Sequence, residues 1–399
     1  MVNISERLCN PPSRGELERR WAGVREIMRE ERCDALILQA ANNVNGTAGH
    51  FRWLTGVSVP SSYPQTLIFP LEGLSTVVMH GGFGERAELN DTDASAPGVG
   101  LRLFAPSFPG VNYCGPLDAE LVADEVRKAG YRRIAILSRN TWYGSMALGL
   151  QSLASDLAFV DITPQVDILK ANKSEEEQGF IRQTAAMQDD ILAKIGAHIQ
   201  PGMREFEVMA YAQYLGQLGG SEGGYYLGAS SPPGQPIAFR RRTEQNRVLR
   251  EGDVMYLQCE SSGPGGLFTH IGRYFILGKA PQQLQDMFGL AIEAQDFTMT
   301  LLKPGTKCAD IFDEYNSWMV SRGQKAERRV HCHGQGFDVV EPPLIRQDET
   351  MALGVNVNIG FHPAITQGRE LVTCCDNLFV DAAGKVERVH KTPRTINEL

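Results

Sequence analysis

The chain has 399 residues, of which 42% are hydrophobic and 22% charged, an ordinary composition for a globular protein that is long enough for two domains. Its net charge of -8 at pH 7 excludes the basic face that nucleic-acid phosphates require, so we expect no nucleic-acid partner. No stretch approaches the roughly 18 apolar residues of a membrane span, and the polar N-terminal segment lacks the apolar core of a signal peptide, so we expect a cytoplasmic protein with no membrane partner.

The first part of the chain alternates helical and strand patterns. Residues 14–32 carry apolar residues at helical spacing between charged ones, which is typical of an amphipathic helix. Short apolar runs bounded by turn residues predict strands, at 34–39, 66–72, 75–80 and 132–138. Helices and strands in alternation indicate a compact α/β domain, which we place at residues 1–165.

A long helix is expected to open the next part of the chain. Ser174 can cap this helix, and Glu177, three residues later, can reach back to it, which is the pattern of a capping box. The helix should end before Pro201. Later strands such as 254–260 follow without a further boundary, so we expect a second domain over residues 166–399.

Five segments in a fixed order carry a family resemblance: VDILKANKSEEEQGFIRQTAAMQDD, IQPGMREFEV, LREGDVMYLQ, THIGRYF and HCHGQGFDVVEPP. Together with FRWLTG at 51–56, they resemble the creatinase/prolidase/methionine aminopeptidase family. The resemblance implies an α+β pita-bread catalytic domain, preceded by a smaller α/β domain as in creatinase and prolidase. One fold hosts many activities, so the resemblance implies the architecture more strongly than the reaction.

The peptidases of this family hold two metal ions with two aspartates, one histidine and two glutamates, and the resemblance assigns these positions here. The first aspartate falls on Gln258 when it is counted along the rigid strand, whereas counting back from the next motif gives Cys259. The second aspartate falls on His270 in HIGR. The family histidine is kept as His333.

The two glutamate positions also carry other residues. The first falls on Gly360 without a gap or on His362 after a two-residue shift, and these two alternatives face the same side of a strand. The last falls on Cys375, next to Asp376. Without bridging carboxylates, nothing screens the repulsion of two divalent ions, so we expect no dinuclear Mn or Co site.

The replacement residues are themselves chemically active types. Glu260 lies two residues after Gln258 and therefore faces the same side of the strand. The expected pocket contains Glu260, His270, His333, His362, Cys375 and Asp376. In one hypothesis the three histidines, with Glu260 or Cys375, bind a single divalent transition metal such as Zn or Fe. In the other the site has no metal, as in creatinase, and the histidines transfer protons.

The resemblance also implies substrate-binding residues. A family histidine that contacts the substrate falls on Arg240 or Arg241, whose planar guanidinium binds carboxylates, and this predicts an anionic small-molecule substrate. A second family histidine falls beside Glu341, which we expect to contact the substrate. In creatinase a loop of the partner subunit covers the site. The corresponding loop here, residues 58–63, offers Tyr63 and predicts a homodimer.

These assignments together predict a small-molecule hydrolase of the creatinase type, acting on a non-peptide C–N bond of an anionic substrate. In this hypothesis His333 leads proton transfer or binds the metal, and His270 and His362 face it. Two alternatives stay open. One is a lyase on the same fold that eliminates a group after proton abstraction, and the other is a non-catalytic binding protein.

Overall fold

The chain divides into two compact units, an N-terminal unit, Met1–Lys170, and a C-terminal unit, Ala171–Leu399. The computed structural model describes residues 4–40, 49–59, 63–114, 116–237 and 239–399. The boundary expected between residues 165 and 166 lies inside helix α5 (Thr163–Ala171). Within the described ranges, no helix combines the length and the apolar character needed to cross a membrane.

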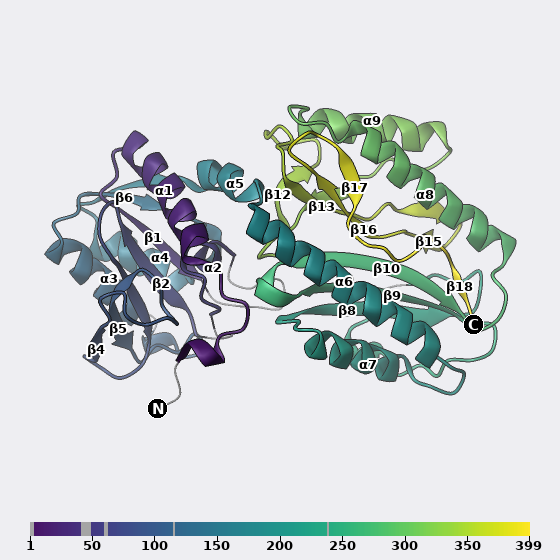
Figure 1. The fold of residues 1–399 in the computed structure, drawn as a ribbon, viewed down its shortest axis with the longest axis horizontal. Helices are drawn as coiled ribbons and strands as arrows, with labels where there is room; N and C mark the ends of the chain where they lie inside the picture. The colour runs from purple at the N-terminus through teal and green to yellow at the C-terminus, as the bar shows by residue number, and fades with distance from the viewer. Residues whose placement is uncertain (1–3, 41–48, 60–62, 115, 238) are drawn as a thin grey trace. The chain divides into compact units, whose positions relative to one another are not determined.

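A seven-stranded mixed sheet forms the centre of the N-terminal unit (Figure 1). In spatial order its strands are β4 (Arg86–Glu88), β5 (Val99–Ala105), β3 (Ser75–His80), β2 (Gln65–Pro70), β1 (Ala35–Ala40), β6 (Arg133–Ile136) and β7 (Ala158–Asp161). Strand β1 is buried along its whole length, which suits its apolar sequence ALILQA. It pairs antiparallel with β2 and parallel with β6.

The helix predicted at residues 14–32 is present as α1, and further helices complete this unit. In chain order the helices are α1 (Arg14–Glu30), α2 (Gly49–Thr55), α3 (Leu117–Lys128) and α4 (Gly144–Leu153), followed by α5. Ser13 caps α1, because its hydroxyl accepts the N–H of Glu16 at 3.2 Å. Val122 of α3 and Leu150 of α4 belong to one buried apolar cluster with Ile37 of β1, so these helices cover the sheet.

Two sheets form the C-terminal unit (Figure 1). The first contains, in spatial order, β18 (Asn397–Glu398), β10 (Phe268–Ile276), β9 (Val254–Ser262) and β8 (Gly223–Ser231). The second contains β12 (Glu341–Ile345), β11 (Cys332–Gly334), β13 (Val357–Phe361), β16 (Asp376–Val380) and β17 (Val386–Arg388). A short ribbon is formed by β14 (Ile365–Gln367) and β15 (Glu370–Val372). All pairings in this unit are antiparallel except that of β18 with β10, as far as the described strands show.

A pair of helices accompanies each of these sheets (Figure 1). The first sheet carries α6 (Glu175–His198) and α7 (Glu205–Leu218), and the second carries α8 (Gln282–Leu301) and α9 (Cys308–Ser321). The predicted capping box opens α6: the hydroxyl of Ser174 accepts the N–H of Glu177 at 3.2 Å, and the Glu177 carboxylate accepts the N–H of Ser174 at 2.8 Å. Ile191 of α6 and Phe275 of β10 belong to one buried apolar cluster, which holds the helix on the sheet.

The two sheets meet where β10 crosses the start of β16. The backbone N–H of Gly272 donates to the carbonyl of Cys375 at 3.1 Å, and the N–H of His270 donates to the side chain of Asn377 at 2.6 Å. A Cβ on Gly272 would lie only 2.0 Å from the hydroxyl of Tyr256, so this crossing requires glycine. The junction brings β9 and β10 next to β11 and β13, which carry the remaining site residues.

Candidate active site

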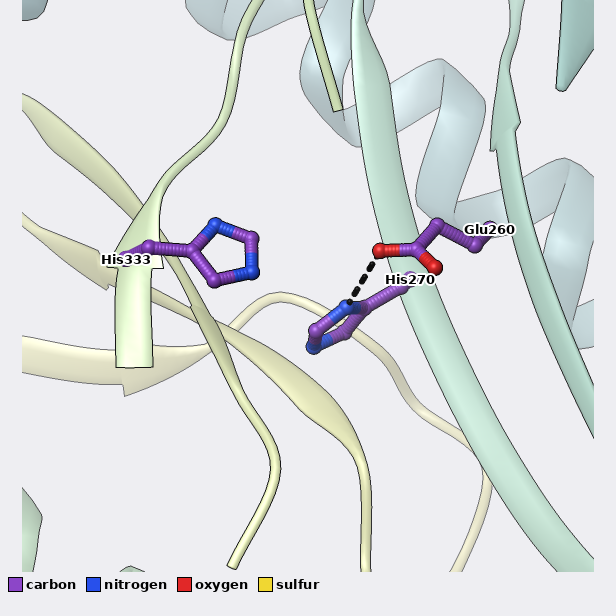
Figure 2. A group of neighbouring side chains, drawn as sticks. All are labelled: Glu260, His270 and His333. Carbon is purple, nitrogen blue, oxygen red and sulfur yellow. Dashed lines mark hydrogen bonds and ion pairs between the residues drawn. The ribbon is translucent and has the colours of Figure 1, made fainter. Parts of the chain in front are cut away.

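The candidate site lies on neighbouring strands of the C-terminal unit. A tight turn, Pro264–Gly266, joins β9 and β10, and Gly265 has a φ of 77°, which glycine adopts without strain. This turn sets the register in which His270 of β10 pairs with Glu260 of β9. The side chains of these two residues meet that of His333 on β11 (Figure 2).

Glu260, His270 and His333 form a compact group of metal-ligand side chains, which we call the central group. One ligand atom of each residue lies within 4.8 Å of those of the other two. The ring planes of His270 and His333 are nearly perpendicular, at 89°, and their centroids are 6.0 Å apart. His270 is fully buried, whereas the side chain of Glu260 keeps 12% of its surface exposed, so solvent reaches the group from the side of Glu260.

Backbone carbonyls determine which ring nitrogen of each histidine carries a proton. Nε2 of His270 lies 3.2 Å from the carbonyl oxygen of Phe361, and Nδ1 of His333 lies 2.9 Å from that of Gly334. A carbonyl oxygen only accepts hydrogen bonds, so each of these nitrogens is the N–H donor. In a neutral ring the lone pair is then on Nδ1 of His270 and on Nε2 of His333.

This protonation pattern places two acceptors face to face. Nδ1 of His270 is 3.3 Å from Oε1 of Glu260, an oxygen that also carries lone pairs (Figure 2). Two acceptors at this distance repel each other unless a positive charge lies between them. That charge is either a proton on His270 or a metal ion that both residues bind.

Burial and neighbouring charges set the protonation states of the other two members. Burial, reinforced by the charge of His270, lowers the pKa of His333 to about 4, so this imidazole is neutral at pH 7. Burial also acts to raise the pKa of Glu260. The hydrogen bond and the charge of His270, together with His333, outweigh that effect and leave the pKa below its ordinary value. A neutral imidazole and an ionised carboxylate are the forms that bind metals.

Two amide side chains hold Glu260. Nε2 of Gln258 donates to Oε2 at 3.3 Å, and Nε2 of Gln335 donates to Oε1 at 3.4 Å. Gln335 is itself fixed by Asn377, whose Nδ2 donates to it at 2.9 Å. Gln335 was not predicted from the sequence, although it lies two residues after His333 and strand parity indicates the same face.

Gly360 leaves the space that His270 occupies. Gly360 pairs with His333 across β13 and β11, and a Cβ built on it would lie 2.9 Å from Cε1 of His270 and 3.0 Å from the amide of Gln335. Any larger residue would therefore displace the imidazole. Position 360, which the ungapped alignment assigns to a family glutamate, thus carries glycine, the one residue that leaves room for His270.

His362 lies beside the central group and lines a cavity that Glu260 and His333 also line. Its ring centroid is 5.2 Å from that of His333 and 5.8 Å from that of His270. Burial, followed by the charges of His333 and His270, lowers its pKa well below the ordinary value, so its ring is neutral at pH 7. The structure brings this predicted residue to the site but outside the set of three converging ligand atoms.

Cys375 also faces the cavity, but as a thiol. The hydroxyl of Tyr256 donates to its sulfur at 3.2 Å, and the sulfur contacts Oε1 of Gln258 at 3.4 Å. Burial raises the pKa of Cys375 to about 12, so no thiolate is present at neutral pH. Cys375 is therefore outside the central group, contrary to its predicted place among the metal ligands.

Two predicted carboxylates point away from the site. Asp376 follows Cys375 in an extended segment and faces the opposite side, where it accepts from Arg273 at 2.8 Å and from Gln295 at 3.1 Å. Glu341 is buried against Lys173, with 3.1 Å between Oε2 and Nζ. Neither lines the cavity, so both assignments are corrected: these residues form internal ion pairs.

Arg240 and Arg241 lie at the surface. Arg240 pairs with Glu244 at 3.6 Å, with half of each side chain exposed. Neither Arg240 nor Arg241 is among the described residues that line the cavity, although their neighbour Phe239 is. The predicted substrate contact of these two arginines stays a prediction.

Tyr63 belongs to the N-terminal unit. Its ring packs against His80, with centroids 4.7 Å apart, and against Phe108 at 6.4 Å. Residues 60–62 of the same predicted loop lie outside the described residues. A substrate contact by Tyr63 and the homodimer stay predictions.

A cavity of about 360 Å³ is lined by two members of the central group, Glu260 and His333. Its polar lining consists of Gln258, Glu260, His333, His362, Thr373 and Cys375. Its apolar lining includes Leu227, Phe239, Val330, Val339, Val340 and Leu371. Arg329 is the one arginine or lysine among the described lining residues. The sequence analysis missed Arg329, because it lies in an irregular loop before β11 where neither periodicity nor the family motifs indicate a role.

Comparison with known proteins identifies the family. The model of metallopeptidase family M24 matches residues 179–382, just over half of the chain. The chain belongs to metallopeptidase family M24. Its predicted membership of the creatinase/prolidase/methionine aminopeptidase family is thereby confirmed.

The relatives of this M24 chain are distant. The uncharacterized hydrolase/peptidase y4tM of Sinorhizobium fredii is 27% identical over 192 residues, which cover 45% of this chain and 47% of that protein. The Xaa-Pro dipeptidase of Pyrococcus furiosus is 22% identical over 227 residues, which cover 55% of this chain and 63% of that protein. The chain thus matches about half to two-thirds of the length of these relatives.

Solved structures share the fold over nearly the whole chain. The X-Pro aminopeptidase of Thermotoga maritima has a TM-score of 0.76 at 17% identity, and the match covers 95% of this chain and 99% of that one. The Xaa-Pro dipeptidase of Bacillus anthracis has a TM-score of 0.74 at 17% identity, covering 96% and 100%. The predicted fold, an α/β N-terminal domain followed by an α+β pita-bread domain, is confirmed.

The predicted reaction is wrong. Relatives of this M24 chain with a specific name include Xaa-Pro dipeptidases and a probable dipeptidase, and the similar structures include an X-Pro aminopeptidase and a prolidase, names that refer to peptide bonds. These findings overturn the expected creatinase-type hydrolysis of a non-peptide C–N bond. The expectation treated loss of the carboxylate ligands as loss of peptide chemistry, whereas two imidazoles and one carboxylate also form a hydrolytic metal site.

Proposed function

We propose that this M24 chain hydrolyses a peptide bond, using one divalent metal ion held by Glu260, His270 and His333. One observation carries the proposal: the lone pair of His270 Nδ1 and the carboxylate of Glu260 face each other at 3.3 Å, and one ligand atom from each of Glu260, His270 and His333 lies within 4.8 Å of the other two. Such a gap between electron-pair donors favours a cation. Membership of a metallopeptidase family supports the metal, and the names of the relatives support the peptide bond.

The donor set fits a single ion of the zinc type. Two histidines and one glutamate bind catalytic zinc in several hydrolases and leave a coordination position open for water. Metal-binding histidines usually donate their other N–H to a carbonyl or carboxylate, which orients the ring. The carbonyls of Phe361 and Gly334 serve His270 and His333 in this way. Iron also accepts imidazole ligands, so Zn and Fe are the two ions to test.

The surrounding residues have defined tasks in this proposal. When bound, the ion would polarise the scissile carbonyl and lower the pKa of a water molecule. Gln258 and Gln335 hold both carboxylate oxygens of Glu260 in place. His362, neutral at pH 7 and 5.2 Å from His333 between ring centroids, would take a proton and return it to the leaving amine.

Elemental analysis of the purified protein tests the metal site directly. We expect about one equivalent of zinc or iron per chain, and its loss in His333→Ala and in Glu260→Gln. His362→Ala is the matched control, because it removes a neighbouring imidazole and should retain the ion. A protein that takes up no ion after dialysis against zinc would contradict the metal site and assign the positive charge to a proton on His270. Uptake of two ions would contradict the single-metal site.

A panel of dipeptides, with product amino acids detected by mass spectrometry, tests the reaction. The metal-loaded protein should release amino acids, and the release should stop on chelation and return with zinc. Failure to cleave any peptide in either N-blocked or free form would refute the reaction class, whatever the metal content.

A further inference from the structure

Arg329 brings a positive charge to the cavity from a rigid loop between α9 and β11. Asn316 of α9 fixes this loop, because its Oδ1 accepts the N–H of Glu327 at 2.7 Å and its Nδ2 donates to the carbonyl of Glu327 at 3.2 Å. The Glu327 carboxylate in turn accepts the backbone N–H groups of Arg328 and Arg329, at 2.9 and 2.7 Å. Within the described part of the chain, no carboxylate forms an ion pair with the Arg329 guanidinium. The loop therefore presents an unneutralised cation.

Arg329 lines the same cavity as Glu260, His333 and His362, so its guanidinium shares the space that a substrate bound at the central group would occupy. Opposite charge on a substrate would be attracted to it there, since the low-dielectric walls of a cavity weaken screening.

The cavity offers no comparable partner for a substrate cation. Glu260 is the one carboxylate among the described lining residues, and it is already engaged by His270, Gln258 and Gln335. A protonated α-amino group would meet Arg329 and, in the proposed function, a divalent ion. Like charges brought together in this way disfavour the ligand that carries them.

The volume and the apolar walls of the cavity limit the length and the polarity of a substrate. A volume of about 360 Å³ is at the low end of the range for small-molecule sites, about 300–1,000 Å³, and suits two small residues rather than a long peptide. Val330, Val339 and Leu371 give it apolar walls, which favour uncharged aliphatic groups.

We propose that the substrate is an N-acylated dipeptide with a free terminal carboxylate, and that Arg329 binds this carboxylate. The inference rests on the proposed peptide hydrolysis and adds the substrate class. The reaction adds one water across the peptide bond: the C–N bond breaks, the hydroxyl joins the acyl carbon, and the amine takes the proton. The products are an N-acyl amino acid and a free amino acid.

Four substrates separate the two ends of the molecule: N-acetyl-Ala-Val, Ala-Val and the C-terminal amides of both. N-acetyl-Ala-Val should have the highest kcat/KM. Amidation of its carboxylate should lower kcat/KM about tenfold or more, because a charge-assisted hydrogen bond is lost. Removal of the acetyl group should also lower kcat/KM about tenfold, through repulsion of the ammonium group.

Variants of adjacent arginines identify the residue responsible. In Arg329→Gln the acid and the amide should react at equal rates within about twofold, and Arg329→Lys should restore part of the preference, since lysine keeps the charge but not the planar fork. Arg328→Gln is the matched control: Arg328 is exposed and is not among the described lining residues, so this variant should behave as the wild type.

The outcomes distinguish this inference from the proposed function. If peptides are cleaved but free Ala-Val is preferred, or the wild type treats acid and amide alike, or Arg328→Gln has the same effect as Arg329→Gln, the substrate class is wrong and the reaction stands. If none of the four is cleaved, the proposed function fails. Titration calorimetry of the same four compounds with wild type and Arg329→Gln then still decides whether Arg329 binds the carboxylate.

Discussion

Glu260 and Asp376 are two buried carboxylates that face basic side chains of the same strand, β10, and their surroundings differ. Asp376 accepts from the guanidinium of Arg273 at 2.8 Å and from Arg388 at 3.2 Å, and its side chain is fully buried. Glu260 faces the imidazole of His270 at 3.3 Å and keeps 12% of its side chain exposed.

The contrast separates a carboxylate that stabilises the fold from one that is available for chemistry. The guanidinium groups of Arg273 and Arg388 and the amide of Gln295 saturate Asp376, so nothing remains for a ligand. The partners of Glu260 lie at 3.3 to 3.4 Å, and one of them presents a lone pair unless a cation intervenes. Under-satisfied ionisable groups in a cavity are characteristic of functional sites, whereas a saturated buried ion pair is a structural feature.

The largest effect should come from breaking the saturated pair. Asp376→Asn leaves the fully buried guanidinium of Arg273 without its counter-charge, and removing one partner of a buried ion pair costs about 3–5 kcal/mol of unfolding free energy. Urea denaturation measures this loss. A change below about 1 kcal/mol would show that Asp376 is not needed to neutralise Arg273.

Glu260→Gln should do the opposite of Asp376→Asn: it should change the unfolding free energy little and the peptidase activity strongly. The unfolding free energy of the metal-free protein should change by less than about 1 kcal/mol, because the hydrogen bonds of Glu260 are long and glutamine keeps the shape. The kcat/KM for peptide hydrolysis should fall about 100-fold or more, since the charge that pairs with the metal is gone. Steady-state kinetics alongside urea denaturation checks both halves, and activity within a few-fold of wild type would remove Glu260 from the centre.

The pH dependence of stability should distinguish His333 from Asp376. The folded pKa of His333, about 4, lies below the ordinary value of 6.5, so between these values the unfolded chain binds a proton that the folded chain does not. The unfolding free energy therefore falls as pH drops from 6.5 towards 4, by up to about 1.4 kcal/mol per pH unit for this group. In His333→Gln, with metal removed, urea denaturation across this range should show a slope smaller by that amount.

Asp376 provides the control for this pH series. Burial acts to raise its pKa, but the charges of Arg273 and Arg388 outweigh burial and leave the pKa below the ordinary 3.8. Its contribution to stability is thus fully present above about pH 4 and is lost only in stronger acid. Asp376→Asn should therefore shift the curve between about pH 5 and 6.5 without changing its slope, and an altered slope there would contradict the assignment. Below about pH 5 the slope also reflects His390, whose pKa burial lowers to about 4 against the opposing charge of Asp376.

The smallest effect should come from the residues that hold Glu260. Gln258→Met keeps the side-chain length but removes the N–H donor that lies 3.3 Å from Oε2 of Glu260. The hydroxyl of Tyr256 keeps a partner in this variant, because it can still donate to the sulfur of Cys375. Loss of such a supporting bond typically weakens metal binding about tenfold or somewhat more. Competition with a chromogenic chelator measures this affinity, and an unchanged value would show that Gln258 does not orient Glu260.

Strand geometry explains what could be predicted from the sequence. Parity on β9 places Gln258 and Glu260 on one face, and the His-Gly motif indicates His333, all of which the structure brings to the cavity. The same rule argues against placing both Cys375 and Asp376 in the pocket, since neighbours in an extended segment face opposite sides. The assignment of family ligand positions to Gln258, Gly360 and Cys375 rests on the resemblance and stays a prediction.

Other features of the site depend on contacts that no local pattern contains. The tautomers of His270 and His333 follow from the carbonyls of Phe361 and Gly334, and that of Phe361 approaches His270 through the contact between two sheets. Arg329 reaches the cavity because Asn316, on a helix, fixes its loop. Non-local contacts of this kind are set by tertiary packing and are invisible to periodicity.

The close fit between Gly360 and His270 restricts how such a centre can evolve. A glutamate introduced at 360 would begin with a Cβ 2.9 Å from the imidazole, so it would expel His270 before it could bind anything. An aspartate introduced at 270 would leave an unfilled space beside Gly360 and lose the donor to the Phe361 carbonyl. Each single exchange passes through an impaired protein, and only the two exchanges together reach a carboxylate-rich centre. The two positions are therefore epistatic: the effect of an exchange at one depends on the residue at the other.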